Sequence, residues 1–175
     1  LGELPEDWTP HRRNARLRTF LAGPRSREAV NRGLADYIPM YSSAIPRLLR
    51  ESPLPLDCCL LQVAPPDAHG YCSLGIAVDV NLSAARAARV VIAQVNRRMP
   101  RTLGDSFLHA SEITRFVEHD ELLLELAWDE PSAVAERIAR YVSSLVEDGA
   151  TVQTGMGRVA GAVLRHLLDK RDLGV

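Results

Sequence analysis

The chain has 175 residues, of which 46% are hydrophobic and 25% charged, and its formal charge is −1 at pH 7. This is the composition of a globular protein with a core, and the near-neutral charge argues against non-specific binding to nucleic acid or to an anionic membrane. No apolar stretch reaches the length of a membrane span, and the three cysteines form no Cys-x-x-Cys pair. We therefore expect a protein of the reducing cytoplasm.

The first part of the chain predicts an irregular arm followed by short helices. Residues 1–24 mix Pro, Arg and Trp8 without periodicity, so we predict an irregular arm there. Residues 26–35 begin with a cap-like Ser26 and predict a helix, and residues 42–50 predict another, with Pro46 tolerated in a first turn or at a bend.

The middle of the chain predicts a parallel sheet. Residues 57–64 are almost continuously apolar, which is typical of a buried central strand. A short strand over residues 74–78, an Ala-rich helix over 83–88 and a β-branched strand over 90–95 are predicted to follow. A strand–helix–strand order favours an open α/β fold, with helices laid over a mostly parallel sheet.

For the last part of the chain we predict two short strands, followed by a helix, a third short strand and a last helix. Strand candidates lie around Phe107 and Phe116, and residues 150–154 form a third. A helix that opens at Pro131 and stops at Gly149 has apolar side chains at a period of 3.6: Val134, Ile138, Tyr141, Val142 and Leu145. The last helix, over residues 158–170, is predicted to bury Val159, Val163, Leu164, Leu167 and Leu168.

A glycine-rich turn precedes that last helix. It reads Gly155, Met156, Gly157, Arg158, Val159 and Ala160, between the predicted strand and the helix. Amides at the start of a helix favour a bound anion, and an arginine there could add a contact to a phosphate. The Gly-x-Gly-x-x-Ala pattern fits a dinucleotide-binding turn, another phosphate-binding turn, or simply a tight strand-to-helix junction.

Other chemically reactive side chains form no convincing site in the sequence. Asp67, His69 and Cys72 are close together, but they are better explained by a turn with Cys72 packed as a small apolar residue. Cys58 and Cys59 point to opposite faces of a strand, so we expect no metal site. The remaining candidates are an acidic cluster, interpreted as a solvated loop, and histidines without assigned partners: Glu112, Glu118, Asp120, Glu121, His109, His119 and His166.

A longer segment carries a family resemblance. Residues 61–75, Leu-Gln-Val-Ala-Pro-Pro-Asp-Ala-His-Gly-Tyr-Cys-Ser-Leu-Gly, closely resemble a characteristic segment of the acetyl-CoA hydrolase/transferase family. That family includes acetate and 4-hydroxybutyrate CoA-transferases. Further segments match in the same order, at residues 36–39, 95–96, 99–101, 104–107 and 145–151 and at the glycine turn. Ala64 replaces the family's common serine, and Ala160 with Gly161 replaces a frequent proline and polar residue.

The resemblance implies a truncated CoA-transferase-type α/β fold. Residues 25–175 would form the latter part of its N-terminal domain, and the C-terminal catalytic domain would be absent. The implied enzyme moves CoA between a short-chain acyl-CoA and a small carboxylate, or hydrolyses acyl-CoA, through a glutamyl-CoA intermediate. No glutamate here matches the family's nucleophile, so we assign no catalytic residue and expect the isolated chain to be inactive.

The resemblance also assigns a ligand to the glycine turn. Gly155, Met156, Gly157, Arg158 and Val159 align with a family segment that contacts CoA, which is a substrate, and no cofactor is expected. The roles of residues 65–72 and 96–101 stay open, as do the acyl group, the acceptor and association between copies. The alternatives are a piece of an NAD-binding oxidoreductase and a non-catalytic scaffold that serves the missing domain.

Overall fold

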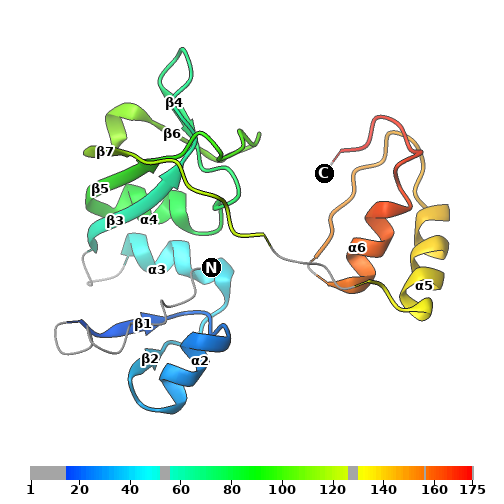
Figure 1. Cartoon of the computed structure of the whole chain (residues 1–175), viewed down its shortest axis with the longest axis horizontal. Helices are drawn as coiled ribbons and strands as arrows, with labels where there is room; N and C mark the ends of the chain where they lie inside the picture. Colours follow the sequence, from blue (N-terminus) through cyan, green and yellow to red (C-terminus); the bar gives the residue numbers. More distant parts are fainter. Residues whose placement is uncertain (1–14, 52–55, 126–129, 156, 175) are drawn as a thin grey trace. The chain divides into compact units, whose positions relative to one another are not determined.

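The computed structural model describes residues 15–51, 56–125, 130–155 and 157–174. The chain divides into two compact units, one up to Leu123 and one from Leu124 onward (Figure 1). Most of the predicted arm, residues 1–14 with Trp8, lies outside the described residues, and so does Met156 of the glycine turn. Within the described ranges, no helix is long and apolar enough to cross a membrane.

The first unit is built on a parallel sheet of three strands. Strands β3 (Leu56–Val63), β5 (Ala88–Val95) and β7 (Arg115–Glu118) lie in the order β3-β5-β7, and both pairings are parallel. Helix α4 (Asn81–Ala87) connects β3 to β5, so the predicted strand–helix–strand crossover is confirmed. The short strands expected around residues 107 and 116 are also present.

The prediction that β3 is the central strand of the sheet is wrong. The sequence predicts residues 57–64 as a central strand, whereas the central strand of the described sheet is β5 and β3 has β5 as its one neighbour there. The carboxyl half of β3 alternates, with Leu61 and Val63 buried and Leu60 74% exposed. The nearly continuous apolar sequence therefore did not predict that only one face of this strand is buried.

The core of the first unit lies between the three-stranded sheet and the segments packed against it, which include α4. Helix α4 packs against β3 and β5, and α3 (Ile45–Glu51) packs against α4. Pro46 lies in the first turn of α3, directly after the 3₁₀ turn Ser42–Ala44, as its missing N–H requires. The buried cluster consists of Cys59, Leu61, Val63, Cys72, Leu74, Ala85, Val91, Ala93, Leu108 and Ile113.

Two further strands and a helix precede the sheet in the sequence. Strand β1 (Leu17–Thr19) pairs in parallel with β2 (Ala35–Tyr37), so part of the segment predicted as irregular is a strand. Helix α2 (Pro24–Asn31) begins before Ser26, which is not its cap, because Gly23 is the N-cap and Pro24 fits the first turn. It ends four residues before the predicted boundary, because Gly33 has a φ of +66° and Ala35 belongs to β2.

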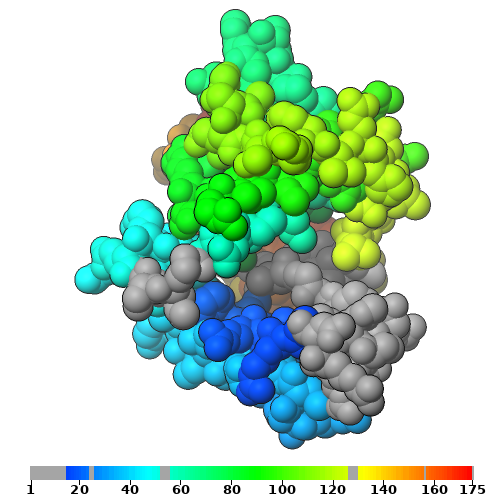
Figure 2. Space-filling model, turned by 90° about the vertical axis from the view of Figure 1, so that its left-hand side faces the viewer, coloured from blue at the N-terminus to red at the C-terminus, as the bar shows by residue number. Residues whose placement is uncertain are grey.

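An antiparallel pair extends from one end of the three-stranded sheet. It consists of β4 (Tyr71–Ser73) and β6 (Phe107–His109). The sequence predicts a strand at residues 74–78, and this prediction is wrong. Strand β4 ends at Ser73, and a turn follows at Gly75. After β6, a 3₁₀ turn (Ala110–Glu112) leads into β7, and this yellow-green region forms much of the upper surface in Figure 2.

The second unit contains two helices, α5 (Ala133–Ser144) and α6 (Arg158–Arg165). Helix α5 begins two residues after the expected start at Pro131, but it ends at Ser144, five residues before the expected stop at Gly149. The Ser132 hydroxyl caps it by accepting a hydrogen bond from the Ala135 amide. Small side chains of α5, at Ala135, Ala139 and Ser143, are the buried ones. The apolar stripe that identified the helix is exposed, at Val134, Ile138, Tyr141, Val142 and Leu145.

Two expectations for the end of the chain are wrong. Residues 150–154 form no strand and contribute one isolated parallel bridge between Thr151 and Gly174. The last helix ends at Arg165 rather than at residue 170, and of its predicted buried stripe only Val163 and Leu167 are buried. These two side chains pack with Ala139 and Ala162, which lets α5 and α6 approach closely.

Candidate functional site

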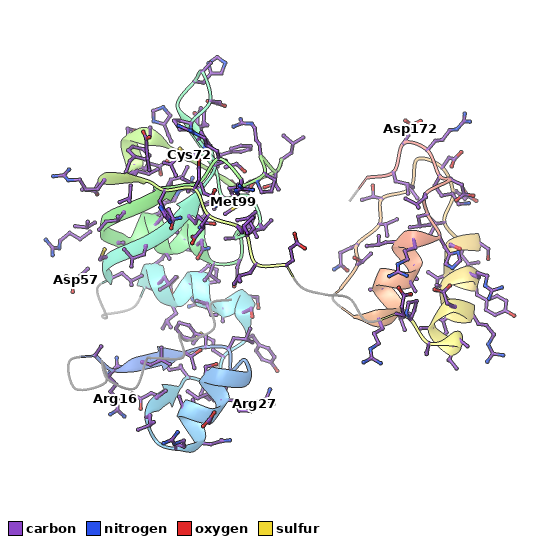
Figure 3. The ribbon with its side chains drawn as sticks, in the orientation of Figure 1. Arg16, Arg27, Asp57, Cys72, Met99 and Asp172 are labelled. Atoms are coloured by element: carbon purple, nitrogen blue, oxygen red, sulfur yellow. The ribbon has the colours of Figure 1, made fainter. Side chains whose placement is uncertain are left out.

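A cavity of about 520 Å³ lies at the carboxyl ends of β3, β5 and β7. In open parallel sheets this is the edge at which ligands bind, because the loops that follow the strands converge there. Figure 3 labels Asp57 at the amino end of β3 and Met99 close to the carboxyl ends. The cavity is lined by Pro65, Pro66, Val95, Arg97, Ala110, Phe116, Glu118, His119 and Asp120.

Asn96 joins the ends of β5 and β7 beside this cavity. Its side chain is fully buried, and its Nδ2 donates a 2.9 Å hydrogen bond to the Glu121 carbonyl. Its Oδ1 accepts from the Arg98 amide at 2.9 Å and from the Glu121 amide at 3.4 Å. A buried amide with partners on both sides fixes the two chain segments relative to each other.

A second set of polar contacts holds the segment after β7. The Glu121 carboxylate accepts hydrogen bonds from the side-chain amides of Gln62 at 2.5 Å and Gln94 at 2.9 Å. The Asp120 carboxylate accepts from the Arg97 amide at 2.7 Å. The predicted acidic cluster is thus more than a solvated loop, because two of its members bind the ends of three neighbouring strands together.

The loop after β3 is held by an ion pair between the two segments whose roles the sequence left open. Arg101 Nη2 donates to Asp67 Oδ2 at 2.6 Å, and Nη1 donates to the Tyr71 carbonyl at 3.3 Å. The guanidinium also lies 4.6 Å from the centre of the Phe107 ring, a cation–π contact. The other Asp67 oxygen accepts from the amides of His69 and Tyr71, each at 2.9 Å.

This arrangement favours the ionised form of Asp67. The backbone hydrogen bond from Tyr71 is the main cause that holds the pKa of this carboxyl below its usual value, and the bond from His69 and the charge of Arg101 act in the same direction. Asp67 is therefore a structural anion of the loop.

Gly75, two residues after β4, lies in close contact with Met99. Gly75 has a φ of +56°, and a Cβ placed on it would overlap the Met99 side chain and lie 2.9 Å from the Pro100 carbonyl oxygen. The Gly75 amide donates to the Ser73 hydroxyl at 3.1 Å, and the Thr102 hydroxyl donates to the Gly75 carbonyl at 3.0 Å. Only glycine fits this position without displacement.

The surroundings of Cys72 agree with its interpretation as a small apolar core residue rather than a nucleophile. Its side chain is fully buried in the core, and burial raises the pKa of the thiol, with the Asp67 charge adding to the effect. Cys58 is exposed and Cys59 buried, so the adjacent cysteines do point to opposite faces. Among the described residues, no group of three or more His, Cys, Asp or Glu side chains could hold a metal ion.

The histidines that lacked partners in the sequence have different surroundings. His109 closes the turn after β6, where its Nδ1 lies 2.8 Å from the Ser111 hydroxyl and its amide donates to Glu112 at 3.0 Å. His166 Nε2 lies 2.7 Å from the Glu136 carboxylate, which connects α6 to α5. His119 lines the cavity.

The glycine turn belongs to the second unit. Gly157 caps α6 with a φ of +146°, where side chains are strained, whereas Gly155 lies outside the left-handed region and has open space around its Cα. The first hydrogen bond of α6 is donated by Gly161 to the Gly157 carbonyl at 2.9 Å, so the preceding amides face out of the helix end. Arg158 and Val159 are exposed on its first turn.

The sequence placed Asn96 and Arg97 in a segment whose role stayed open and named His119 as a histidine without a partner, but it assigned none of these residues, nor Phe116, to a binding site. The available signal was position: Asn96 and Arg97 directly follow a predicted strand, and Phe116 and His119 lie in or just after another strand candidate. That signal depends on knowing that the strands are neighbours and parallel.

Solved structures with this arrangement are CoA-transferase folds. RipA from Yersinia pestis superposes with a TM-score of 0.78 at 33% identity, over 90% of this chain and 38% of RipA. A 4-hydroxybutyrate CoA-transferase from Porphyromonas gingivalis superposes with a TM-score of 0.71 at 32% identity, over 95% of this chain and 44% of that one. The fold class is therefore that of the CoA-transferases.

Sequence comparison identifies the family. The model of the acetyl-CoA hydrolase/transferase N-terminal domain matches residues 3–127, and the chain belongs to this family. It is 45% identical to a 4-hydroxybutyrate coenzyme A transferase of Clostridium kluyveri, over 93% of this chain and 38% of that protein. It is 39% identical to a succinyl-CoA:cyclohexane-1-carboxylate CoA transferase of Geobacter metallireducens, over 97% of this chain and 38% of that protein.

The chain thus spans about two fifths of the length of these relatives. The family match ends close to the boundary between the two units, which falls at Leu123. None of the relatives reported above is named as a dinucleotide-dependent enzyme, so the NAD-binding alternative has no support from them.

Proposed function

We propose that this chain is part of a cytoplasmic enzyme that transfers CoA between a short-chain acyl-CoA and a small carboxylate, or hydrolyses the acyl-CoA. The match of residues 3–127 to the family carries the proposal. Several relatives are named for CoA transfer between carboxylic acids, and the chain has a preformed cavity at the ligand-binding edge of its sheet.

The proposed reaction uses a glutamate that lies outside this chain, in a further domain. Its carboxylate oxygen attacks the thioester carbonyl carbon, the C–S bond breaks, and CoA leaves as a thiolate, which gives an acyl-glutamyl anhydride. The thiolate then attacks the glutamyl carbonyl carbon, which releases the first carboxylate and leaves a glutamyl-CoA thioester. A second carboxylate reverses these steps to give the new acyl-CoA, whereas water would release CoA and complete a hydrolysis.

The role proposed for this chain is to bind and position substrate. The open space beside Gly155 and Gly157, at the N-terminus of α6, supports contact with CoA there, because a glycine turn at a helix N-terminus favours phosphate oxygens. No described residue is assigned to covalent chemistry.

The reaction is tested on the full-length protein. Sodium borohydride reduces an enzyme thioester, so we expect it to inactivate the enzyme only after preincubation with acyl-CoA. Protein treated with borohydride alone is the control. Equal survival with and without acyl-CoA would exclude the glutamyl-CoA intermediate, and CoA release measured with and without acetate separates transfer from hydrolysis.

The CoA contact is tested by calorimetric titration of CoA, with NAD as comparison ligand. Gly155→Ala adds a methyl group without backbone strain, so we expect CoA affinity to fall about tenfold, or 1.4 kcal/mol, at unchanged stability. Gly149→Ala is the control: at a φ of +76° it lowers stability and leaves CoA affinity unchanged. Unchanged affinity in Gly155→Ala would remove the turn from the CoA site.

A further inference from the structure

The cavity at the sheet edge has apolar walls contributed by several segments. Pro65 and Pro66 come from the loop after β3, Val95 from the end of β5, Ala110 from the turn after β6, and Phe116 from β7. The Phe116 side chain is 44% exposed, although it is an aromatic residue on a paired strand. An apolar wall of this kind gains free energy from an aliphatic ligand, in proportion to the surface that the ligand covers.

The charges around the same cavity disfavour an anionic ligand. The lining residues that carry full charge at neutral pH are one cation, Arg97, and two anions, Glu118 and Asp120. Arg97 Nη1 lies 3.9 Å from Asp120 Oδ2, so this pair largely cancels and the charge of Glu118 remains. A ligand that carried its own carboxylate into the cavity would meet net repulsion.

The walls are held in place before any ligand arrives. Arg97 and Asp120 are joined through the Arg97 amide at 2.7 Å, and the buried Asn96 ties the same two segments together. The Pro65–Pro66 wall leads into the loop that the Asp67–Arg101 ion pair closes. A preorganised cavity can discriminate between ligands of similar size, because it does not adapt its charges to each one.

We propose that this cavity receives the acyl chain of the acyl-CoA substrate, and that it selects uncharged aliphatic acyl groups against acyl groups that end in a carboxylate. Phe116 supplies apolar contact to the chain, and Glu118 repels a terminal carboxylate. The inference rests on the proposed function, since it takes the acyl-CoA from there and adds the acyl class.

The experiment compares butyryl-CoA with succinyl-CoA in the full-length protein, with acetate as the common acceptor. We expect the wild-type kcat/KM to be higher for butyryl-CoA. Phe116→Ala should lower kcat/KM for butyryl-CoA about tenfold. Glu118→Gln should raise kcat/KM for succinyl-CoA about threefold relative to kcat/KM for butyryl-CoA, which is the range expected for one exposed charge.

Glu51→Gln is the matched control, because Glu51 is an exposed glutamate of α3 that pairs with Arg47 and does not line the cavity. Thermal unfolding of each variant confirms that it is folded. If wild-type protein neither transfers nor hydrolyses any acyl-CoA, the proposed function fails and this inference with it. If it turns over substrate but prefers succinyl-CoA, or if Phe116→Ala and Glu118→Gln leave the butyryl-to-succinyl ratio unchanged, only the inference about the cavity is overturned.

Discussion

Replacing Gly75 by alanine should destabilise the first unit through two separable effects. The first is backbone strain, because an L-residue at a φ of +56° costs about 1–2 kcal/mol. The second is steric: the new Cβ would overlap the Met99 side chain, which is 5% exposed, and lie 2.9 Å from the Pro100 carbonyl oxygen. Overpacking of this kind costs about 1–3 kcal/mol, so the expected total is about 2–5 kcal/mol.

Gly33 provides a matched comparison in the same unit. It has a φ of +66°, and a Cβ placed on it meets nothing within 4 Å, so Gly33→Ala carries the strain without the overlap. Both substitutions restrict the unfolded chain equally, and this contribution cancels in their difference. The difference between the two free energies of unfolding therefore measures the contact with the segment at residues 99–100.

The assay is urea denaturation of wild type and both variants, followed by far-ultraviolet circular dichroism. We expect Gly75→Ala to lose at least 1 kcal/mol more than Gly33→Ala, which corresponds to a melting temperature about 2–4 °C lower for a chain of this size. Equal losses in the two variants would refute the close packing of the turn at Gly75 against Met99.

Three further predictions concern other parts of the first unit. Asn96→Ala should lower the free energy of unfolding by about 2–4 kcal/mol in urea denaturation, since it removes two good hydrogen bonds and leaves a void; a loss below 1 kcal/mol would contradict the network. Because the folded pKa of Asp67 is lowered, chiefly by the Tyr71 amide, its stabilisation is complete above the unfolded pKa of about 3.9 and is lost as the pH falls through the folded value. Asp67→Asn should therefore flatten the dependence of stability on pH below about pH 4, and an unchanged slope would refute the coupling. Cys58 should react rapidly with a disulfide reagent in the folded protein while Cys72 reacts only after unfolding, as counted by absorbance with Cys58→Ser as control; two or more fast thiols would contradict the burial.

Local patterns predicted several elements well because their signals are short in range. The apolar run at residues 57–64 and the β-branched run at 90–95 became β3 and β5, with α4 between them. Ser132 capped α5 within one turn of the predicted start. The sequence of β3 did not reveal that β5 would be the central strand, because sheet order depends on pairing with residues far along the chain.

The sequence also did not determine which face of a helix is buried. The period of 3.6 predicted that α5 is a helix, although not its end at Ser144, yet its buried side chains are small and its large apolar side chains are exposed. Periodicity identifies a helix and its faces, but the partner decides which face is buried, and close approach of two helices favours small residues.

By itself, the sequence determined the parallel strand–helix–strand unit, the family through its motif at residues 61–75, and the exclusion of Cys72 as a nucleophile. Only the tertiary structure decided which residues form the cavity, because Pro65, Val95 and Phe116 are brought together by the order and direction of three strands. The same holds for the Asp67–Arg101 ion pair, whose members are 34 residues apart. Propensity and periodicity act within one element, whereas a site forms between elements, where contacts depend on how the whole sheet assembles.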